Sequence, residues 1–77
     1  MGKMEVTINT EYITLSALLK LSGIAKTGGE AKIMVQDGRV KVNGETETRR
    51  GRKLYEGDRV EVLQNPPVTI LVKRDVY

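Results

Sequence analysis

The chain has 77 residues and a formal net charge of +3, and it contains neither cysteine nor histidine. A chain of this length predicts one small domain, residues 1–77, and the two missing residue types exclude disulfides, the common zinc and iron–sulfur ligand sets, cysteine nucleophiles and histidine acid–base catalysis. No apolar run approaches the roughly 18 residues that span a membrane, and residues 1–10 lack the apolar stretch of a signal peptide, so we expect a soluble cytoplasmic protein without membrane contact.

The first elements predicted along the chain are a short strand and a helix. Residues 4–9 alternate polar and apolar side chains, which is typical of a strand with one buried face. After Thr14, which can cap a helix, apolar residues recur at helical spacing as far as Ser22 and Gly23. They are Leu15, Leu18 and Leu19, with Ala17 and Leu21 widening the stripe. A helix this apolar is expected to pack on two sides, against a sheet and against another helix.

A second helix is predicted from Thr27 onward. Thr27 and Glu30 fit a capping box, in which the Thr hydroxyl accepts a hydrogen bond from the backbone N–H of Glu30 and the Glu carboxylate accepts one from the Thr N–H. Asp37 and Gly38 supply the stop. The inward stripe consists of Ala31, Met34 and Val35. Ile33 falls on the polar side of this helix, where packing against a strand and partial exposure both fit the pattern.

The second half of the chain predicts strands. Residues 39–42 alternate with a period of two, and Asn43-Gly44 is a strong hairpin signal because both turn positions tolerate positive φ. The return strand is expected over 45–48, followed by strands over 59–63 and 68–73. This order predicts an α+β domain in which two short helices pack against a small, mainly antiparallel sheet of about four to five strands.

The stretch GIAKTGGEAK, Gly23–Lys32, has the glycine spacing of a phosphate-binding P-loop. Gly29-Glu30 stands where that loop requires Lys followed by Ser or Thr, so a nucleotide site is excluded. A helix start remains, where free N–H groups and the helix dipole attract an anion and where Lys26 and Lys32 could reach one phosphate path. The alternative is an elbow, in which Thr27 satisfies the helix end and the glycines permit close helix packing.

A second basic segment is Arg49–Lys53, RRGRK, which has four cations in five residues. Such a local patch can hold a phosphate backbone even when the net charge is small, although similar runs also occur on solvated surfaces. Taken together, the helix start and this run favour contact with a nucleic-acid backbone.

Two helices followed by GRVKVNGE and RRGRKLYEGDRVEV resemble the RNA-binding domain of small-subunit ribosomal protein S-four, also called the alpha-L motif. The residues that carry the resemblance are Ala31, Met34, Val35, Gly38, Val40, Val42, Asn43, Gly44, Gly57, Asp58, Val60 and Val62. The similar segment covers residues 13–63, about two-thirds of the chain. SGIAKTGGEAK is similar to the version in small free-standing members of the YaaA/YbcJ type.

The resemblance implies a non-catalytic protein that binds structured RNA, such as ribosomal RNA or a ribosomal subunit, in ribosome assembly. It implies no small-molecule substrate, and it leaves room for a protein partner. The expected RNA-binding residues, on the two-helix face and the adjoining hairpin, are Lys26, Thr27, Gly28, Gly29, Lys32, Lys41, Arg49, Arg50, Arg52 and Lys53. Many members carry Ser-Arg where this chain has Thr27-Gly28, so the two lysines and the backbone at Gly28-Gly29 would replace the arginine contact.

The aromatic residues indicate how RNA would be held. Only Tyr12, Tyr55 and Tyr77 occur, and none falls in a stacking cluster in the sequence. Proteins that read single-stranded RNA usually stack bases on aromatic platforms. Cations, hydroxyls and exposed amides instead suit phosphate and 2′-OH contacts on folded RNA.

Other functions compete with RNA binding. A β-grasp-like protein-interaction module also fits the size and the VNGE and GD-x-V-x-V segments, but a sulfur or ubiquitin-type carrier needs a C-terminal Gly-Gly, and this chain ends in Val76-Tyr77. No recognition-helix pattern favours DNA. Neither catalysis nor a metal or cofactor is expected. The acidic residues that could serve in catalysis fall at turns and hairpin positions, and the sequence pairs none of them with a group that would shift its pKa. They are Asp37, Glu45, Glu47, Glu56 and Asp58.

Overall fold

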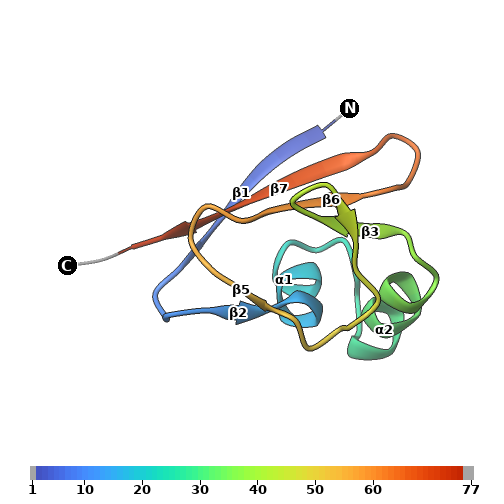
Figure 1. The fold of residues 1–77 in the computed structure, drawn as a ribbon, viewed down its shortest axis with the longest axis horizontal. Helices are drawn as coiled ribbons and strands as arrows, with labels where there is room; N and C mark the ends of the chain where they lie inside the picture. The colour runs from blue at the N-terminus through green and yellow to red at the C-terminus, as the bar shows by residue number, and fades with distance from the viewer. Residues whose placement is uncertain (1, 76–77) are drawn as a thin grey trace.

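The computed structural model describes residues 2–75, which form a five-stranded sheet, two helices on one side of it and a separate two-stranded ribbon (Figure 1). The elements are β1 (Gly2–Ile8), β2 (Ile13–Thr14), α1 (Leu15–Leu21), α2 (Gly28–Gln36), β3 (Val40–Val42), β4 (Glu45–Thr46), β5 (Lys53–Leu54), β6 (Arg59–Val62) and β7 (Val68–Arg74). The sheet has the order β1-β7-β6-β3-β4, and β2 pairs with β5 in the ribbon. The predicted α+β class is confirmed. Neither helix has the length and apolar character needed to cross a lipid bilayer.

The core lies between one face of the sheet and the inner faces of both helices. Alternate strand residues point toward the helices and lose almost all contact with water. In β3, β6 and β7 these residues are Val40, Val42, Val60, Val62, Ile70 and Val72. The helices contribute Leu15, Leu18, Leu19, Ala31 and Val35, which are fully buried. The predicted stripes are confirmed for these residues and for Met34, whereas Ala17 is only partly buried. Leu21 is 62% exposed because the last turn of α1 carries it away from the core.

Both helices begin where a threonine hydroxyl caps them. The Oγ1 atom of Thr27 accepts from the Glu30 N–H at 3.1 Å, and Oγ1 of Thr14 accepts from the Ala17 N–H at 3.4 Å. The predicted start of each helix is therefore confirmed. The reciprocal bond of the capping box is absent from the described residues, and Glu30 instead lines a hollow together with Ile33 and Met34.

The strands pair antiparallel except at one edge of the sheet. β3 pairs with β4 and with β6, and β6 pairs with β7, all antiparallel, whereas β1 runs parallel to β7. The hairpin at Asn43-Gly44 is confirmed, with φ of 52° and 88° at its two central residues. The return strand, Glu45–Thr46, is shorter than the predicted 45–48. The Glu47 N–H still donates to the Val40 carbonyl at 2.9 Å, and the chain then leaves β3 and reaches the start of α1 at Arg50 and Arg52.

The ribbon is the part of the fold that the sequence pattern does not predict. Ile13 pairs with Leu54 and Thr14 pairs with Lys53. Strands of two residues carry too little alternation to be recognised, and these two lie far apart in the chain. The ribbon places the segment 49–53 against the start of that helix.

Candidate nucleic-acid interface

The segment Arg49–Lys53, termed here the basic turn, is anchored by a buried carboxylate. The side chain of Glu47 is 8% exposed and accepts hydrogen bonds from the Arg49 backbone N–H at 3.0 Å, from Arg49 Nε at 3.2 Å and from Arg52 Nη1 at 2.9 Å. The side-chain hydrogen bonds of Arg49 first, and of Arg52 next, lower the pKa of Glu47 to about 2. The expectation that this acid lacks a perturbing partner is therefore wrong. The sequence gives no sign that Glu47 is buried.

The backbone of the basic turn is docked on the start of α1. The N–H groups of Leu15 and Ser16 donate to the carbonyl oxygens of Arg52 and Arg50, at 2.9 and 3.0 Å. These N–H groups belong to the first turn of α1, where the backbone donors have no acceptor inside the helix. The basic turn is thus held by the Glu47 carboxylate and through its own backbone carbonyls, while the Arg49 side chain remains 76% exposed.

The other two cations of the turn are held less tightly. Arg50 is exposed and forms no ion pair with any residue between 2 and 75. Lys53 is also exposed, and its Nζ lies 4.8 Å from the centre of the Tyr12 ring. A shallow hollow lies beside them, lined by Arg49, Gly51, Arg52 and Lys53. All four predicted cations of this segment therefore lie on one exposed turn.

The start of α2 presents the second predicted group. Lys26, Thr27, Gly28, Gly29 and Lys32 are all exposed. A Cβ atom added at Gly28 would meet nothing within 4 Å, so helix packing does not require this glycine. In the described part of the chain neither lysine forms an ion pair. The elbow alternative is thus right about the Thr27 cap and wrong about the packing role of Gly28.

Lys41 lies apart from the other predicted contacts. It is the central residue of β3, between two valines that point into the core, so its side chain points to the face of the sheet that the helices do not cover. Its partners in register are Thr46 and Glu61. The sheet separates Lys41 from the basic turn. One ligand could contact both only if it wrapped around the edge strand β4.

Several residues that carry the family resemblance prove to be framework. The side chain of Asn43 accepts from the Arg59 N–H at 2.9 Å and donates to the Asp58 carboxylate at 3.1 Å. Asp58 in turn accepts from the Tyr55 N–H at 2.8 Å. Gly57 has φ of 91°, which a side chain rarely adopts. This network joins the β3–β4 hairpin to the turn before β6.

Two tyrosines come together, contrary to the expectation that no aromatic cluster exists. The rings of Tyr12 and Tyr55 have centroids 6.0 Å apart, and they are 39% and 44% exposed as residues. Tyr77, the third aromatic, lies outside the described residues. The pairing follows from the β2–β5 ribbon, which was not predicted. The sequence did carry one signal of this surface. Lys53, Leu54 and Tyr55 alternate polar and apolar, which in an extended chain places Lys53 and Tyr55 on the same face.

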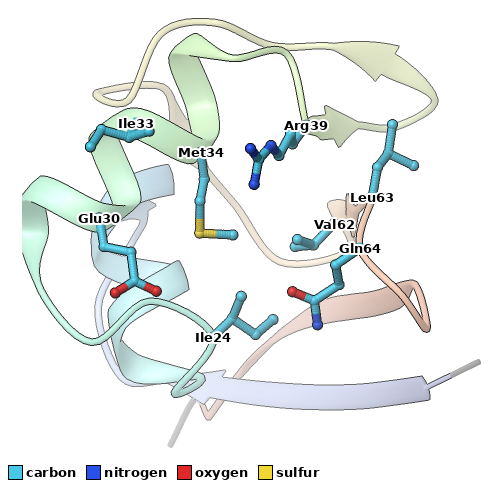
Figure 2. A pocket seen from close by; sticks show the side chains of 8 residues that line it. All are labelled: Ile24, Glu30, Ile33, Met34, Arg39, Val62, Leu63 and Gln64. Atoms are coloured by element: carbon cyan, nitrogen blue, oxygen red, sulfur yellow. The ribbon is translucent and has the colours of Figure 1, made fainter.

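Ile33 is exposed and borders an open hollow between α2 and the end of β6. Figure 2 shows the residues around it, with Met34 extending from α2 and Arg39 pointing inward from the strand side. The other lining residues are Ile24, Glu30, Val62, Leu63 and Gln64. Ile33 is 60% exposed, so partial exposure rather than strand packing describes it. Within residues 2–75, no cluster of three or more potential metal-binding side chains is present.

Comparison with known proteins identifies the family. The S4 domain model matches residues 6–71. A protein of Bacillus subtilis (strain 168) named "Probable ribosome maturation protein RlbA" is 49% identical over 57 residues, covering 74% of this chain and 80% of that protein. "Putative RNA-binding protein YbcJ" of Escherichia coli (strain K12) is 43% identical over 49 residues, covering 64% and 70%. The resemblance drawn from the sequence is confirmed, and this chain belongs to the S4 domain family.

Proposed function

We propose that this protein binds structured RNA without catalysing a reaction, and that the basic turn is its main phosphate contact. The observation that carries this proposal is the anchoring of Arg49 and Arg52 by Glu47 together with docking of the turn on α1. A guanidinium held in place loses little conformational entropy when it binds a phosphate, and its planar array of N–H groups matches phosphate oxygens. The S4 domain match and the names of the two relatives support RNA as the ligand.

The start of α2 would provide the second phosphate contact. Lys26 and Lys32 flank exposed backbone N–H groups at Gly28 and Gly29, where the helix dipole is positive. The glycine at position 28 leaves space for a phosphate to approach the backbone closely. These contacts position an RNA and favour its shape over its sequence.

Ribosomal RNA is the target that we propose, and ribosome assembly is the process. One relative is named as a ribosome maturation protein, and nearly three-quarters of this chain aligns with it. Sedimentation of cell extracts tests the assignment: the protein should migrate with a ribosomal subunit or its precursor at low salt. Crosslinking in cells followed by sequencing should recover ribosomal RNA. Recovery of protein partners without RNA would instead support a protein-interaction module.

Salt dependence tests the phosphate contacts directly. If Lys26, Lys32, Arg49, Arg50 and Arg52 contact about five phosphates, log affinity should fall with log salt at a slope of roughly −3 to −5. Arg50→Ala should weaken binding to unrelated structured RNAs by a similar factor, because the lost contact reads no base. Lys3→Ala removes the same charge from the uncovered face of the sheet and serves as the control. Binding that is flat in salt, or equal loss in both variants, would refute the proposed surface.

A further inference from the structure

The outer face of the β2–β5 ribbon carries an aromatic pair that the phosphate contacts do not use. Ile13 and Leu54 are register partners that pack toward the core. Extending this antiparallel register by one residue places Tyr12 opposite Tyr55, and the same alternation places Lys53 beside them on the outer face. The ribbon therefore exposes two rings and one ammonium group on a single surface.

The geometry leaves part of each tyrosine accessible to a ligand. Their centroids are 6.0 Å apart and their planes are inclined by 49°, so neither ring covers the other face to face. The residues are 39% and 44% exposed, and neither phenol hydroxyl bonds to another residue in the described chain. Both tyrosines are more than half buried and Lys53 Nζ lies over the Tyr12 ring, so the fold uses part of each side chain and leaves the rest open to a ligand.

The pair is held in position by the backbone on both sides. The Tyr55 N–H donates to the Asp58 carboxylate at 2.8 Å, and its carbonyl accepts from the Asp58 N–H at 3.0 Å. On the facing strand, the Tyr12 carbonyl accepts from the hydroxyl of Thr10 at 2.8 Å. The rings therefore project from a frame that is formed before any ligand binds.

Charge around the pair is positive on the side of the basic turn. Lys53 Nζ lies 4.8 Å from the Tyr12 ring centre, and the chain continues from it to Arg52. On the other side, the chain neighbours of the tyrosines are Glu11 and Glu56. A nucleotide bound here would find aromatic surface for its base and cations toward the basic turn for its phosphate.

We propose that Tyr12, Tyr55 and Lys53 form a stacking site for an unpaired base, so that the preferred ligand is a folded RNA with a loop or bulge rather than an uninterrupted duplex. Bases in a continuous duplex are stacked on one another and present no free face, whereas an unpaired base does. Stacking on an aromatic side chain is tolerant of base identity, which agrees with recognition of shape. This inference rests on the proposed function, since it places the site beside the phosphate contacts.

The test compares two RNAs, a hairpin whose loop carries the fluorescent base 2-aminopurine and a fully paired duplex with the same number of phosphates. Tyr55→Leu and the double variant Tyr12→Leu/Tyr55→Leu should lose about 5- to 100-fold in affinity for the hairpin, the range expected for stacking of one base. Affinity for the duplex should change by less than about twofold, because the phosphate contacts remain. Tyr55→Phe keeps the ring and should bind the hairpin as the parent does.

A second measurement avoids ring removal. The chain has three tyrosines and no tryptophan, so in Tyr77→Phe the intrinsic fluorescence comes from Tyr12 and Tyr55 alone. Adding the hairpin should quench this fluorescence and the 2-aminopurine signal together, and the duplex should not quench it. Thermal unfolding of each variant establishes that the fold is kept.

The outcomes separate this inference from the proposed function. If the leucine variants bind the hairpin as tightly as the parent while Arg50→Ala binds weakly, the stacking site is refuted and RNA binding stands. If the parent binds neither RNA, both fail. An aromatic surface that instead captures a peptide, with no quenching by the hairpin, would also refute the stacking site.

Discussion

Two cationic regions of this protein carry similar charge and are built in opposite ways. In the basic turn, Glu47 binds two guanidinium groups and α1 holds the backbone. At the start of α2, Lys26 and Lys32 extend from exposed positions, and only the Thr27 cap fixes the surrounding chain. If the basic turn binds phosphate as we propose, the comparison teaches that one buried acid can improve such a site. Glu47 fixes the direction of two guanidinium groups, and the four positive charges of the turn still exceed its single negative charge.

The largest expected effect comes from removing the carboxylate that distinguishes the two regions. Glu47→Gln should lower the free energy of unfolding by about 1–3 kcal/mol, since the variant loses hydrogen bonds to charged groups in a buried position. Urea unfolding measures the change. Glu45→Gln, at an exposed position in β4, is the matched control and should change stability by less than about 0.5 kcal/mol. Equal effects of the two substitutions would show that Glu47 does not anchor the turn.

Acid should remove the stabilisation that Glu47 contributes to the folded protein. Hydrogen bonds from Arg49, and then from Arg52, hold the pKa of Glu47 at about 2 in the folded protein, against 4.5 for the ordinary group. The unfolded chain therefore takes up this proton first as the pH falls, and the stability contributed by Glu47 is complete above 4.5 and lost between 4.5 and about 2. Thermal unfolding between pH 7 and pH 2 should show the parent approaching Glu47→Gln across this window. A constant difference between them would contradict the assignment.

The two regions should also differ in how much RNA affinity they contribute. Arg49→Ala/Arg50→Ala should weaken binding to structured RNA by roughly tenfold, or about 1.4 kcal/mol, and Lys26→Ala/Lys32→Ala should weaken it less. Both pairs remove two charges, so each should reduce the salt slope by about 1–2. The difference arises because Arg49, which Glu47 orders, loses less conformational entropy on binding than an exposed lysine. Fluorescence anisotropy at several salt concentrations measures both quantities, and a larger loss for the lysine pair would reverse the comparison.

The smallest expected effect concerns the cap of α2. Thr27→Ala removes the acceptor for the Glu30 N–H and should cost about 1 kcal/mol of stability. Chemical denaturation measures it, with Thr48→Ala as the control, because the exposed Thr48 hydroxyl makes no hydrogen bond within residues 2–75. If the start of α2 contacts phosphate, Thr27→Ala should also weaken RNA binding slightly, since the helix start is then less ordered. Unchanged stability would mean that the cap contributes nothing.

Features that depend on neighbours in the chain were predictable. The stripes at Leu15, Leu18 and Leu19, the threonine caps and the Asn43-Gly44 turn each follow from spacing or conformational preference within a few residues. The family resemblance was also readable. Its residues Asn43, Gly57 and Asp58, however, turn out to build the framework, and the proposed contacts lie mostly at other positions.

Features that depend on long-range pairing were missed. Burial of Glu47, the docking of residues 49–53 on α1 and the Tyr12–Tyr55 pair all arise because β5 returns beside β2. The ribbon has only two residues in each strand, too few for a pattern. Leu21 was misassigned for a related reason, since the last turn of a short helix can leave the core while keeping helical spacing.

The linear chain was enough to specify the α+β class, the family and the cationic segments, because local periodicity, turn chemistry and charge do not depend on distant contacts. Only the tertiary structure decided how those cations are presented. It placed a carboxylate under Arg49 and Arg52, left Lys26 and Lys32 without an ion pair among residues 2–75, and turned Lys41 to the other face of the sheet. Hydrogen bonds and burial act through space, so the pKa of Glu47 and the exposure of the tyrosine pair exist only once the ribbon has formed.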